Sequence, residues 1–415
     1  MAAQARAETG SMDSRWLAMY PSHSRQPFVP AGSSGPWVVT SQGGVVFDCG
    51  GYGMLSFGHN PKRILHALCQ PQHQANLMTR NPAQAEFAAA VEPHISTRQI
   101  ACLNSGSEAN SLALRIANTH KSGDSVVVAL KGSFHGRTEG PAGISDSSAA
   151  LYSRHLASYP DALKRTRLLE PNDVQGVHQT FDSIKRANQY VECAIVETVM
   201  GEGRPATAIT PDFYDAVQRR VQEAGGLMIV DSVQSGMRCN GWLSIMQMEG
   251  FGGAEPPDVE SFAKAVHAGQ FPVSFVALSQ RAAERYAQGT YGNTTTATPR
   301  ALAVMTACLR ELTPDIQANI RSRGEELLQV LRDACDARVV KDVRGIGLLL
   351  AIQLHTQYDV MHAERMFRNA GLNVIHGGEN CIRLTPWFLL SSEECTLIGK
   401  VVHEVTREMY TRILR

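Results

Sequence analysis

The segment IACLNSGSEANSLALRIA, residues 100–117, predicts a strand, a turn and a helix in direct succession. Its first residues are apolar, and its later apolar positions fall on one face of a helix, namely Ala109, Leu112, Ala113, Ile116 and Ala117. A Ser-Gly-Ser turn at a helix start directs free backbone N–H groups toward an anion, which the helix dipole also favours. The same turn is compatible with a simple N-cap made by Ser105 or Ser107, so the turn alone leaves a phosphate site open.

The chain contains further short apolar runs, rich in β-branched residues, at 125–130, 193–199, 226–232 and 272–278. Runs of this length and composition are typical of strands that are buried on both faces of a sheet. The segments between them are long enough to hold crossover helices. The pattern therefore predicts an α/β fold in which helices wrap a mostly parallel sheet.

A chain of 415 residues is too long for one small core and predicts a large domain with a smaller one. Toward the C-terminus, long helical stretches are followed by VVKDVRGIGLLLAIQL and CIRLTP, which predict a separate α+β unit. The short strands and turns of VVTSQGGVVFDCGGYG, near the N-terminus, are expected to join that unit. The predicted division is 1–60 for the N-terminal segment of the small domain, 61–300 for the large domain and 301–415 for the C-terminal part of the small domain.

The charge balance limits the kinds of binding partner to expect, and the cysteine pattern predicts the cellular compartment. Lys and Arg together number 39, as do Asp and Glu, so electrostatics give no reason to expect nucleic acid or an anionic membrane as partner. The 9 cysteines are scattered, without a C-x-x-C pair or a Cys/His cluster at metal-ligand spacing, which predicts no metal site and reduced thiols in the cytoplasm. Residues 1–16 lack an apolar signal core, and no run of about eighteen apolar residues follows. We therefore expect small-molecule ligands and no membrane segment.

The segment SFAKAVHAGQFPVSFVAL, residues 261–278, contains a single charged side chain, that of Lys264, if His267 is neutral. Lys264 could lie at the protein surface, with its apolar stem along the surface and its ammonium in water. A lysine partly removed from water instead loses its proton readily and becomes a Schiff-base nucleophile. The segment alone leaves both interpretations open.

Asp231 stands at the end of the apolar run GLMIVDS, where α/β sheets place their ligands. A carboxylate there can pair with a protonated pyridine nitrogen and hold a pyridoxal ring as an electron sink, or it can simply cap the following loop. Gln234 could contact the ring hydroxyl or serve as a hydrogen-bonding residue of that loop. A phosphate cradle, a carboxylate and an isolated lysine are together the three anchors of pyridoxal phosphate.

With these anchors in place, the sequence resembles the class III aminotransferases, which are fold-type I pyridoxal-phosphate enzymes. The matching segments, in family order, are FDCGGYGMLSFGHNP, LNSGSEANSLALRIA, GSFHGRT, AIVETVMGEGRP, LMIVDSVQSG, PDVESFAKAVHAGQFPVS, YGNTTTATPRAL, VRGIGLLLAIQL and NCIRLTP. The resemblance implies a large domain with a mostly parallel sheet and a smaller α+β domain built from the two chain ends. It also implies pyridoxal 5′-phosphate as the cofactor.

The resemblance assigns the cofactor site residue by residue. Lys264 would form the Schiff base with the cofactor and carry a proton during turnover, and Asp231 would keep the ring nitrogen protonated. The remaining assignments are Gly106 and Ser107 to the phosphate, Phe134 to the ring face, Gln234 to the ring hydroxyl and His135 to the same cofactor site. Thr294, in YGNTTTATP, would reach the phosphate of a neighbouring subunit, which implies a homodimer with shared active sites.

The resemblance also assigns four substrate-binding residues. Arg383 would grip the α-carboxylate of 2-oxoglutarate or glutamate, a bidentate contact that suits a guanidinium. Glu202 would pair with Arg383 and mask it while an ω-amine substrate binds. Arg137 would receive a distal carboxylate of the substrate, and Tyr52 would shape the pocket around its α-end. Each of these residues could otherwise be an ordinary surface or core residue.

Several positions depart from the family pattern. The family usually has Asp-Glu-Val-Gln where this chain has Asp231 followed by Ser232, and it has Glu-Pro where this chain has Glu197 followed by Thr198. The glycine run after the lysine is replaced here by residues 267–270, His-Ala-Gly-Gln. The chemical anchors remain, so the departures bear on the identity of the amino donor more than on the reaction.

The sequence therefore predicts a pyridoxal-phosphate-dependent transaminase. The expected donor is the ω-amine of an ornithine-, acetylornithine-, lysine-, diaminobutyrate- or 4-aminobutyrate-like amino acid, and the expected acceptor is the α-keto acid 2-oxoglutarate, in a ping-pong mechanism. The alternatives are an aminomutase or racemase on the same fold, a transaminase that uses pyruvate, and a binding module that retains the fold without catalysis.

Overall fold

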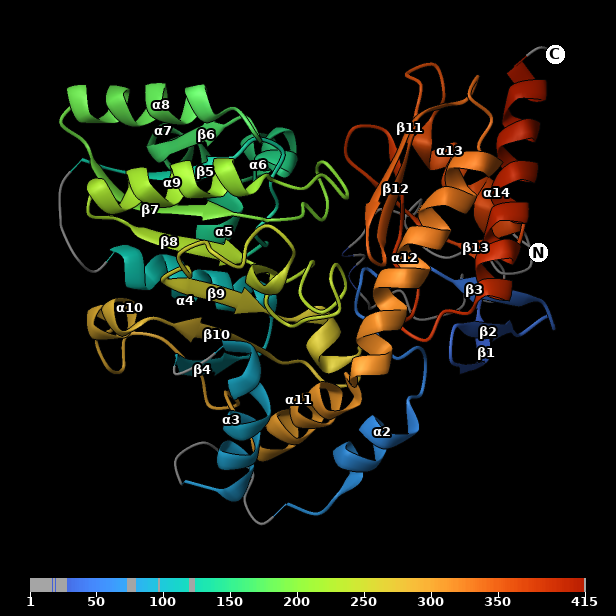
Figure 1. Ribbon diagram of the computed structural model, residues 1–415, viewed down its shortest axis with the longest axis horizontal. Coiled ribbons are helices and arrows are strands. Elements are labelled where there is room, and N and C mark those ends of the chain that lie inside the picture. Colours follow the sequence, from blue (N-terminus) through green and yellow to red (C-terminus); the bar gives the residue numbers. More distant parts are fainter. Residues whose placement is uncertain are drawn as a thin grey trace.

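The computed structural model describes Leu17, Met19 and residues 28–72, 80–95, 98–118 and 124–413. Figure 1 shows a large sheet flanked by helices on one side of the molecule, with smaller sheets and long C-terminal helices on the other side. Residues 1–16, in which the sequence shows no signal core, lie outside the described part.

A seven-stranded sheet forms the centre of the larger part, in the order β4-β10-β9-β8-β7-β5-β6. Its strands are β4 (Gln99–Leu103), β5 (Ser125–Leu130), β6 (Thr166–Leu169), β7 (Tyr190–Val196), β8 (Leu227–Asp231), β9 (Val259–Phe262) and β10 (Ser274–Leu278). Strands β6, β5, β7, β8 and β9 pair in parallel, and the central ones are buried, as their continuous apolar runs predict. The predicted α/β class with a mostly parallel sheet is confirmed.

Strand β10 is the exception, because it runs antiparallel to both β4 and β9. Between the end of β9 at Phe262 and the start of β10 at Ser274 there is only a short 3-10 turn, η4 (Lys264–His267). A parallel connection needs a crossover of roughly a dozen or more residues, usually a helix, so this short connection reverses the chain direction. The reversal leaves the lysine-bearing turn at the edge of the sheet where β8 and β9 end.

Helices cover both faces of the large sheet (Figure 1). Helices α4 (Gly106–Asn118) and α10 (Gln280–Arg285) pack on one face, and α8 (Val174–Arg186) and α9 (Pro211–Glu223) pack on the other. The shorter elements of this part are α5 (Glu139–Gly143), η2 (Asp146–Ser148), α6 (Ala149–His155), α7 (Tyr159–Arg165) and η3 (Ile245–Gln247). Among the described helices, none is both long and apolar enough to cross a membrane.

The second part of the fold contains both ends of the described chain. Its two sheets have the orders β1-β2-β3-β13 and β11-β12-β15-β14, and β3 pairs in parallel with β13. The strands are β1 (Pro30–Ser34), β2 (Trp37–Thr40), β3 (Val45–Asp48), β11 (Val340–Ile346), β12 (Leu349–Leu354), β13 (Leu372–Asn373), β14 (Ile375–Gly377) and β15 (Cys381–Leu384). Its helices are α12 (Pro314–Ala334), α13 (Val360–Asn369) and α14 (Ser392–Ile413). Helix α11 (Pro299–Glu311) packs against α2 (Lys62–Cys69) and α3 (Pro82–Ile95), and α3 lies beside β4 and β10 of the large sheet (Figure 1). The division at residues 60 and 300 stays a prediction.

Arg238, in the loop after β8, joins the two parts. Its guanidinium is fully buried and donates hydrogen bonds to the carbonyl oxygens of Leu348 at 3.1 Å, Gly53 at 3.2 Å and also Pro386. The guanidinium carbon lies 5.0 Å from the centroid of the Phe388 ring. Burial lowers the pKa of Arg238 to about 10, so the cation persists at neutral pH. The Arg238 side chain, from the loop after β8, thus contacts an N-terminal segment at Gly53 and C-terminal segments at Leu348 and Pro386.

Replacing Arg238 with Met should lower the free energy of unfolding by about 3 kcal/mol, because buried carbonyl oxygens lose their donor. Urea denaturation followed by circular dichroism measures the change. Arg219→Met, at an exposed position of α9, is the matched control and should shift stability by less than about 0.5 kcal/mol. A loss for Arg238→Met no larger than that of the control would contradict the joining role of Arg238.

Candidate active site

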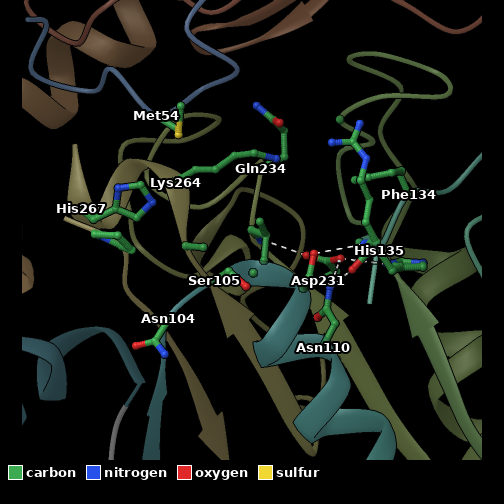
Figure 2. A pocket seen from close by; sticks show the side chains of 18 of the residues that line it. Met54, Asn104, Ser105, Asn110, Phe134, His135, Asp231, Gln234, Lys264 and His267 are labelled. Carbon is green, nitrogen blue, oxygen red and sulfur yellow. Dashed lines mark hydrogen bonds and ion pairs between the residues drawn. The ribbon is translucent and has the colours of Figure 1, made fainter. Parts of the chain in front are cut away.

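A cavity of about 450 Å³ lies at the edge of the large sheet where β5, β7, β8 and β9 end. The predicted site residues that line it are Gly106, Ser107, Phe134, His135, Arg137, Glu202, Asp231, Gln234 and Lys264. Figure 2 shows Lys264 reaching across the cavity toward Gln234, with Asp231, Asn110 and His135 grouped below them. Tyr52, Thr294 and Arg383 are not among the lining residues.

Lys264 is the first residue of η4, and its side chain is partly buried and lines this cavity (Figure 2). Its backbone φ is 49°, in the left-handed region that is uncommon for residues other than glycine and that recurs at functional sites. Burial lowers the pKa of Lys264, and the Arg383 cation lowers it further, against the opposing charge of Glu202. The amine is therefore easier to deprotonate than that of a surface lysine.

Asp231, the last residue of β8, is the centre of a buried hydrogen-bond network. Its Oδ2 accepts hydrogen bonds from Asn110 Nδ2 at 2.7 Å and from His135 Nδ1 at 2.8 Å, while its Oδ1 accepts one from the Val233 N–H at 3.0 Å. Asn110 is not among the predicted site residues, although a polar residue on the apolar face of α4 is a sequence signal for it. These donors fix the orientation of the carboxylate at the cavity.

The turn before α4 approaches the rest of the cavity closely. A Cβ atom at Gly106 would lie 2.7 Å from Val233 Cγ1, so the turn fits there only with glycine. Ser105 Oγ accepts a hydrogen bond from the Glu108 N–H at 3.2 Å, as an N-cap does. Because Ser105, Gly106 and Ser107 also line the cavity, the helix start is both capped and directed at the cavity, so the two interpretations of this turn are compatible.

Glu197 follows β7 much as Asp231 ends β8, yet it is not among the predicted site residues. Its Oε1 accepts a hydrogen bond from the Phe134 N–H at 2.9 Å, and its Oε2 accepts one from the Gly201 N–H at 2.8 Å. Burial raises the pKa of Glu197 to about 7, against the lowering effect of His135 and with a further rise from Asp231. The rule that ligands lie at strand ends, applied to β7, would have identified this residue.

Arg383, in β15, is 1% exposed and lies behind the cavity wall. Its guanidinium donates a hydrogen bond to the carbonyl oxygen of Gly201, a lining residue, and lies 5.7 Å from the centroid of the Tyr52 ring. No ion pair within 4.0 Å joins Arg383 to Glu202, both of which are described. Burial lowers the pKa of Arg383, and Glu202 opposes this without direct contact. The predicted pairing is therefore absent as a direct contact, and Tyr52 and Gly201 cover the arginine instead.

Arg137 lies at the exposed mouth of the cavity. Its backbone N–H donates a hydrogen bond to Ser107 Oγ at 3.2 Å, and its guanidinium carbon lies 5.6 Å from the centroid of the Phe134 ring. Burial raises the pKa of Tyr152, and the Arg137 cation lowers it, which places this arginine near a second aromatic residue. Arg137 thus places a cation at an exposed part of the cavity lining.

Thr294 is exposed and lies in the loop that precedes α11. Its neighbours Asn293 and Thr295 accept hydrogen bonds from Asn104 Nδ2 at 3.0 Å and 3.1 Å. Asn104 directly precedes the turn at the start of α4, so this loop rests against the predicted phosphate turn of the same chain. The predicted contact of Thr294 with a neighbouring subunit stays a prediction.

The departures from the family pattern differ in position. His267 and Gln270 line the cavity, and His267 Nδ1 accepts a hydrogen bond from the Gly269 N–H at 3.1 Å. Burial lowers the pKa of His267 to about 4, and the Lys264 cation lowers it as well, so the imidazole is neutral at neutral pH. Ser232, by contrast, is buried and does not line the cavity. The residues that replace the glycine run, His267 and Gln270, therefore change the cavity lining itself. Ser232 can affect the cavity only through the residues that separate it from the cavity.

The donor set of the cavity fits pyridoxal 5′-phosphate. Gln234 Nε2 and His135 Nε2 are buried without a hydrogen-bond partner among the described residues, and Gln234 projects into the cavity (Figure 2). Lys264 supplies an amine, Asp231 a carboxylate for the ring nitrogen, and the turn at Gly106 an anion-binding helix start. The residues present thus match the aldehyde, ring nitrogen, ring hydroxyl and phosphate of that cofactor.

A model of the family described as "Aminotransferase class-III" matches residues 19–405. The matched range contains every residue that lines the cavity. The chain therefore belongs to the class-III aminotransferases. These enzymes depend on pyridoxal 5′-phosphate and act on an amino donor and a keto acid acceptor, so the predicted cofactor and reaction class are confirmed.

Individual proteins are similar along nearly the whole chain. The acetylornithine aminotransferase of Lactococcus lactis subsp. lactis (strain IL1403) is 27% identical over 382 residues, which covers 91% of this chain and 96% of the relative. That of Neisseria meningitidis serogroup B is 29% identical over 394 residues, with 90% and 93% covered. In fold, the chain is similar to the ornithine aminotransferase of Toxoplasma gondii with PLP at partial occupancy, at a TM-score of 0.83 and 21% identity, with 99% and 95% covered.

The raised pKa of Glu197 predicts a pH-dependent contribution to stability, which Glu197→Gln should abolish. Because the folded pKa of about 7 lies above the ordinary value, the contribution of Glu197 is complete below the unfolded pKa and is lost as the pH rises through about 7. Between about pH 5 and pH 8, the free energy of unfolding of the cofactor-free wild type should fall relative to the variant by up to about 3 kcal/mol.

Urea unfolding of both proteins across this pH range measures the difference. Glu92→Gln, at an exposed position of α3, is the control, and its difference from the wild type should not change with pH. A constant difference between Glu197→Gln and the wild type would show that Glu197 is ionised throughout and would contradict the prediction.

Proposed function

We propose that this enzyme transfers the terminal (ω) amino group of an amino acid to 2-oxoglutarate in a ping-pong sequence of two half-reactions. The donor class is an ornithine-, acetylornithine-, lysine-, diaminobutyrate- or 4-aminobutyrate-like amino acid. The observation that carries the proposal is Arg383, a buried guanidinium behind the wall of the cavity that contains Lys264. It is covered by Tyr52 and forms no ion pair with any residue in the described part of the chain. Such a group suits the α-carboxylate of a keto acid. The names of the two acetylornithine aminotransferases support the same donor class.

Lys264 performs the covalent and proton-transfer steps in this proposal. The bound cofactor supplies an electron sink for the carbanion at the substrate carbon. Lys264 would hold the cofactor through its aldehyde carbon, and its Nζ, when free of the cofactor, would accept the proton from the substrate carbon. Both tasks need a neutral amine, and burial together with the Arg383 cation lowers the pKa of Lys264 in that direction.

The other cofactor contacts follow from the cavity geometry. Asp231, oriented by Asn110 and His135, would keep the ring nitrogen protonated. Gln234, whose Nε2 has no protein partner among the described residues, would bind the ring hydroxyl. The phosphate is assigned to the helix start at Gly106 and Ser107, and the ring face to Phe134.

The two substrates would be separated by the cover over Arg383. With Tyr52 and the Gly201 carbonyl in place, Arg383 is covered. The α-carboxylate of an entering ω-amino acid then does not bind to Arg383. The negative charge of Glu202 favours the protonated form of Arg383 without direct contact. Displacement of this cover exposes Arg383 to the keto acid. Arg137, at the cavity mouth, would bind a distal carboxylate.

The enzyme would act as a homodimer in the cytoplasm, and each active site would contain residues of both subunits. Thr294 is exposed beside the start of α4, where a symmetry-related copy could reach a neighbouring phosphate. For the Thr294→Ala enzyme, sedimentation measures whether the dimer is intact and titration with pyridoxal 5′-phosphate measures cofactor affinity. We expect an intact dimer with weakened cofactor binding. Unchanged cofactor affinity would argue against the contact.

A screen of amino donors with the holoenzyme tests the proposed reaction. Each ω-amino acid of the proposed class is combined with 2-oxoglutarate or with pyruvate, and the product glutamate or alanine is quantified. Glutamate formation from at least one ω-amine is the expected result. Turnover with pyruvate alone would replace the proposed acceptor, and rearrangement of a donor without any acceptor would identify an aminomutase or racemase.

Lys264→Ala should abolish turnover while cofactor still binds non-covalently, because the remaining contacts are intact. Borohydride reduction followed by peptide mass spectrometry should place a pyridoxyl group on Lys264 of the wild type and on no residue of the variant. Lys400→Ala, at an exposed position of α14, is the control and should be labelled and active like the wild type. Full residual activity of Lys264→Ala would refute its assigned role.

Glu202→Ala should raise the rate with glutamate relative to the ω-amine by about tenfold, since the arginine loses the charge that holds it. The ratio of the two kcat/KM values measures the effect. Glu404→Ala, at an exposed position of α14, should leave that ratio unchanged. If Glu202→Ala also leaves it unchanged, Glu202 does not control access to Arg383.

A further inference from the structure

Glu260 is a buried carboxylate that does not line the cavity. It lies within β9, and none of its side chain is exposed. The next residue, Ser261, donates a hydrogen bond to Asn110 Oδ1 at 2.7 Å. Because successive residues of a strand point to opposite faces, Glu260 lies on the side of the sheet away from the Asp231 network. A charge in such a place is costly unless it is paired and hydrogen-bonded.

The Glu260 carboxylate is fully engaged. Its Oε1 accepts a hydrogen bond from Ser232 Oγ at 2.7 Å, and Ser244 Oγ lies 2.8 Å from Oε2 and 3.0 Å from Oε1. Arg98 Nη1 forms an ion pair with Oε2 at 3.3 Å. Burial raises the pKa of Glu260, and Arg98 and the two serines lower it. Glu260 thus binds two hydroxyls and one cation from three separate segments.

The two serines bracket a segment that forms part of the cavity. Residues 232–244 follow β8 along the chain and include Val233 and Gln234, both of which line the cavity. Val233 also packs against the turn at Gly106, where a Cβ atom would lie 2.7 Å from its Cγ1. A contact that holds both ends of this segment therefore sets the position of the residues proposed to meet the cofactor ring.

Position 232 is where the segment after β8 meets Glu260. Ser232 is 1% exposed and touches the Glu260 carboxylate through its hydroxyl. Because the Ser232 hydroxyl contacts the Glu260 carboxylate directly, a glutamate at position 232 would bring a second carboxylate against Glu260. Two adjacent buried carboxylates repel each other, so the two charges disfavour one another.

We propose that Glu260 is a positioning residue for the cofactor. Its buried carboxylate on β9 holds both ends of segment 232–244 through Ser232 and Ser244, so that Val233 and Gln234 face the cofactor ring. The inference rests on the assignment of the cavity to the cofactor and not on the identity of the amino donor.

An exchange of the carboxylate between the two positions tests the proposal. The proteins are the wild type, Glu260→Leu, Ser232→Glu and the double variant Ser232→Glu/Glu260→Leu, with Glu260→Gln as a milder variant and the exposed Glu92→Leu as control. Cofactor affinity is measured by fluorescence titration of each apoprotein with pyridoxal 5′-phosphate, and the unfolding midpoint of each apoprotein is measured separately. No donor or acceptor is present, so failure here is distinguishable from failure of the proposed reaction.

Glu260→Leu should lose about tenfold in cofactor affinity, and Glu260→Gln should lose several-fold, because the serine hydroxyls lose a charged acceptor. The double variant should recover to within about threefold of the wild type, and Ser232→Glu alone should lower the unfolding midpoint most, because two carboxylates then share one site. Wild-type affinity in Glu260→Gln would overturn the proposal, even if Glu260→Leu fails to fold. So would a folded double variant that binds no better than Glu260→Leu, or variants that lose stability at unchanged affinity.

Discussion

Parallel strands that end at one edge of the sheet are the constraint on which the site depends. Because β7, β8 and β9 pair in parallel, the residues at and beyond their carboxyl ends are held a strand spacing apart. Glu197, Asp231 and Lys264 come from these three ends and line one cavity. The short turn η4 then reverses the chain into β10, which keeps the lysine at this edge instead of carrying it across the sheet.

The charges around this edge act as one electrostatic unit. Burial lowers the pKa of both Lys264 and Arg383, the Arg383 cation lowers that of Lys264 further, and the charge of Glu202 acts on both in the opposite sense. Since Arg383 bonds to Gly201 and not directly to Glu202, small movements of the segment after β7 would change the balance. Glu197, which fixes Gly201 through its N–H, links this balance to the aromatic segment at Phe134.

Local sequence signals predict the parts of this arrangement that one segment determines by itself. The apolar runs predict the parallel strands, and the residue types at their ends identify Asp231 and Lys264. Neighbours across strands are not visible in this way, so the sequence pattern does not identify the contact of Asn110 with Asp231 or that of Glu260 with Ser232. The antiparallel course of β10 and the missing direct contact between Glu202 and Arg383 likewise depend on the path of the chain in three dimensions. The roles assigned to the site residues stay predictions.

A single-turnover measurement without keto acid tests the central claim most directly. Holoenzyme is mixed with one ω-amino acid donor, and the aldehyde product and the cofactor absorbance are followed together. We predict about one equivalent of aldehyde per cofactor, with the amino group retained on the enzyme until 2-oxoglutarate is added. Continued turnover of the donor into an isomer, or no product at all, would contradict a transaminase that uses Lys264 and Asp231 in two half-reactions.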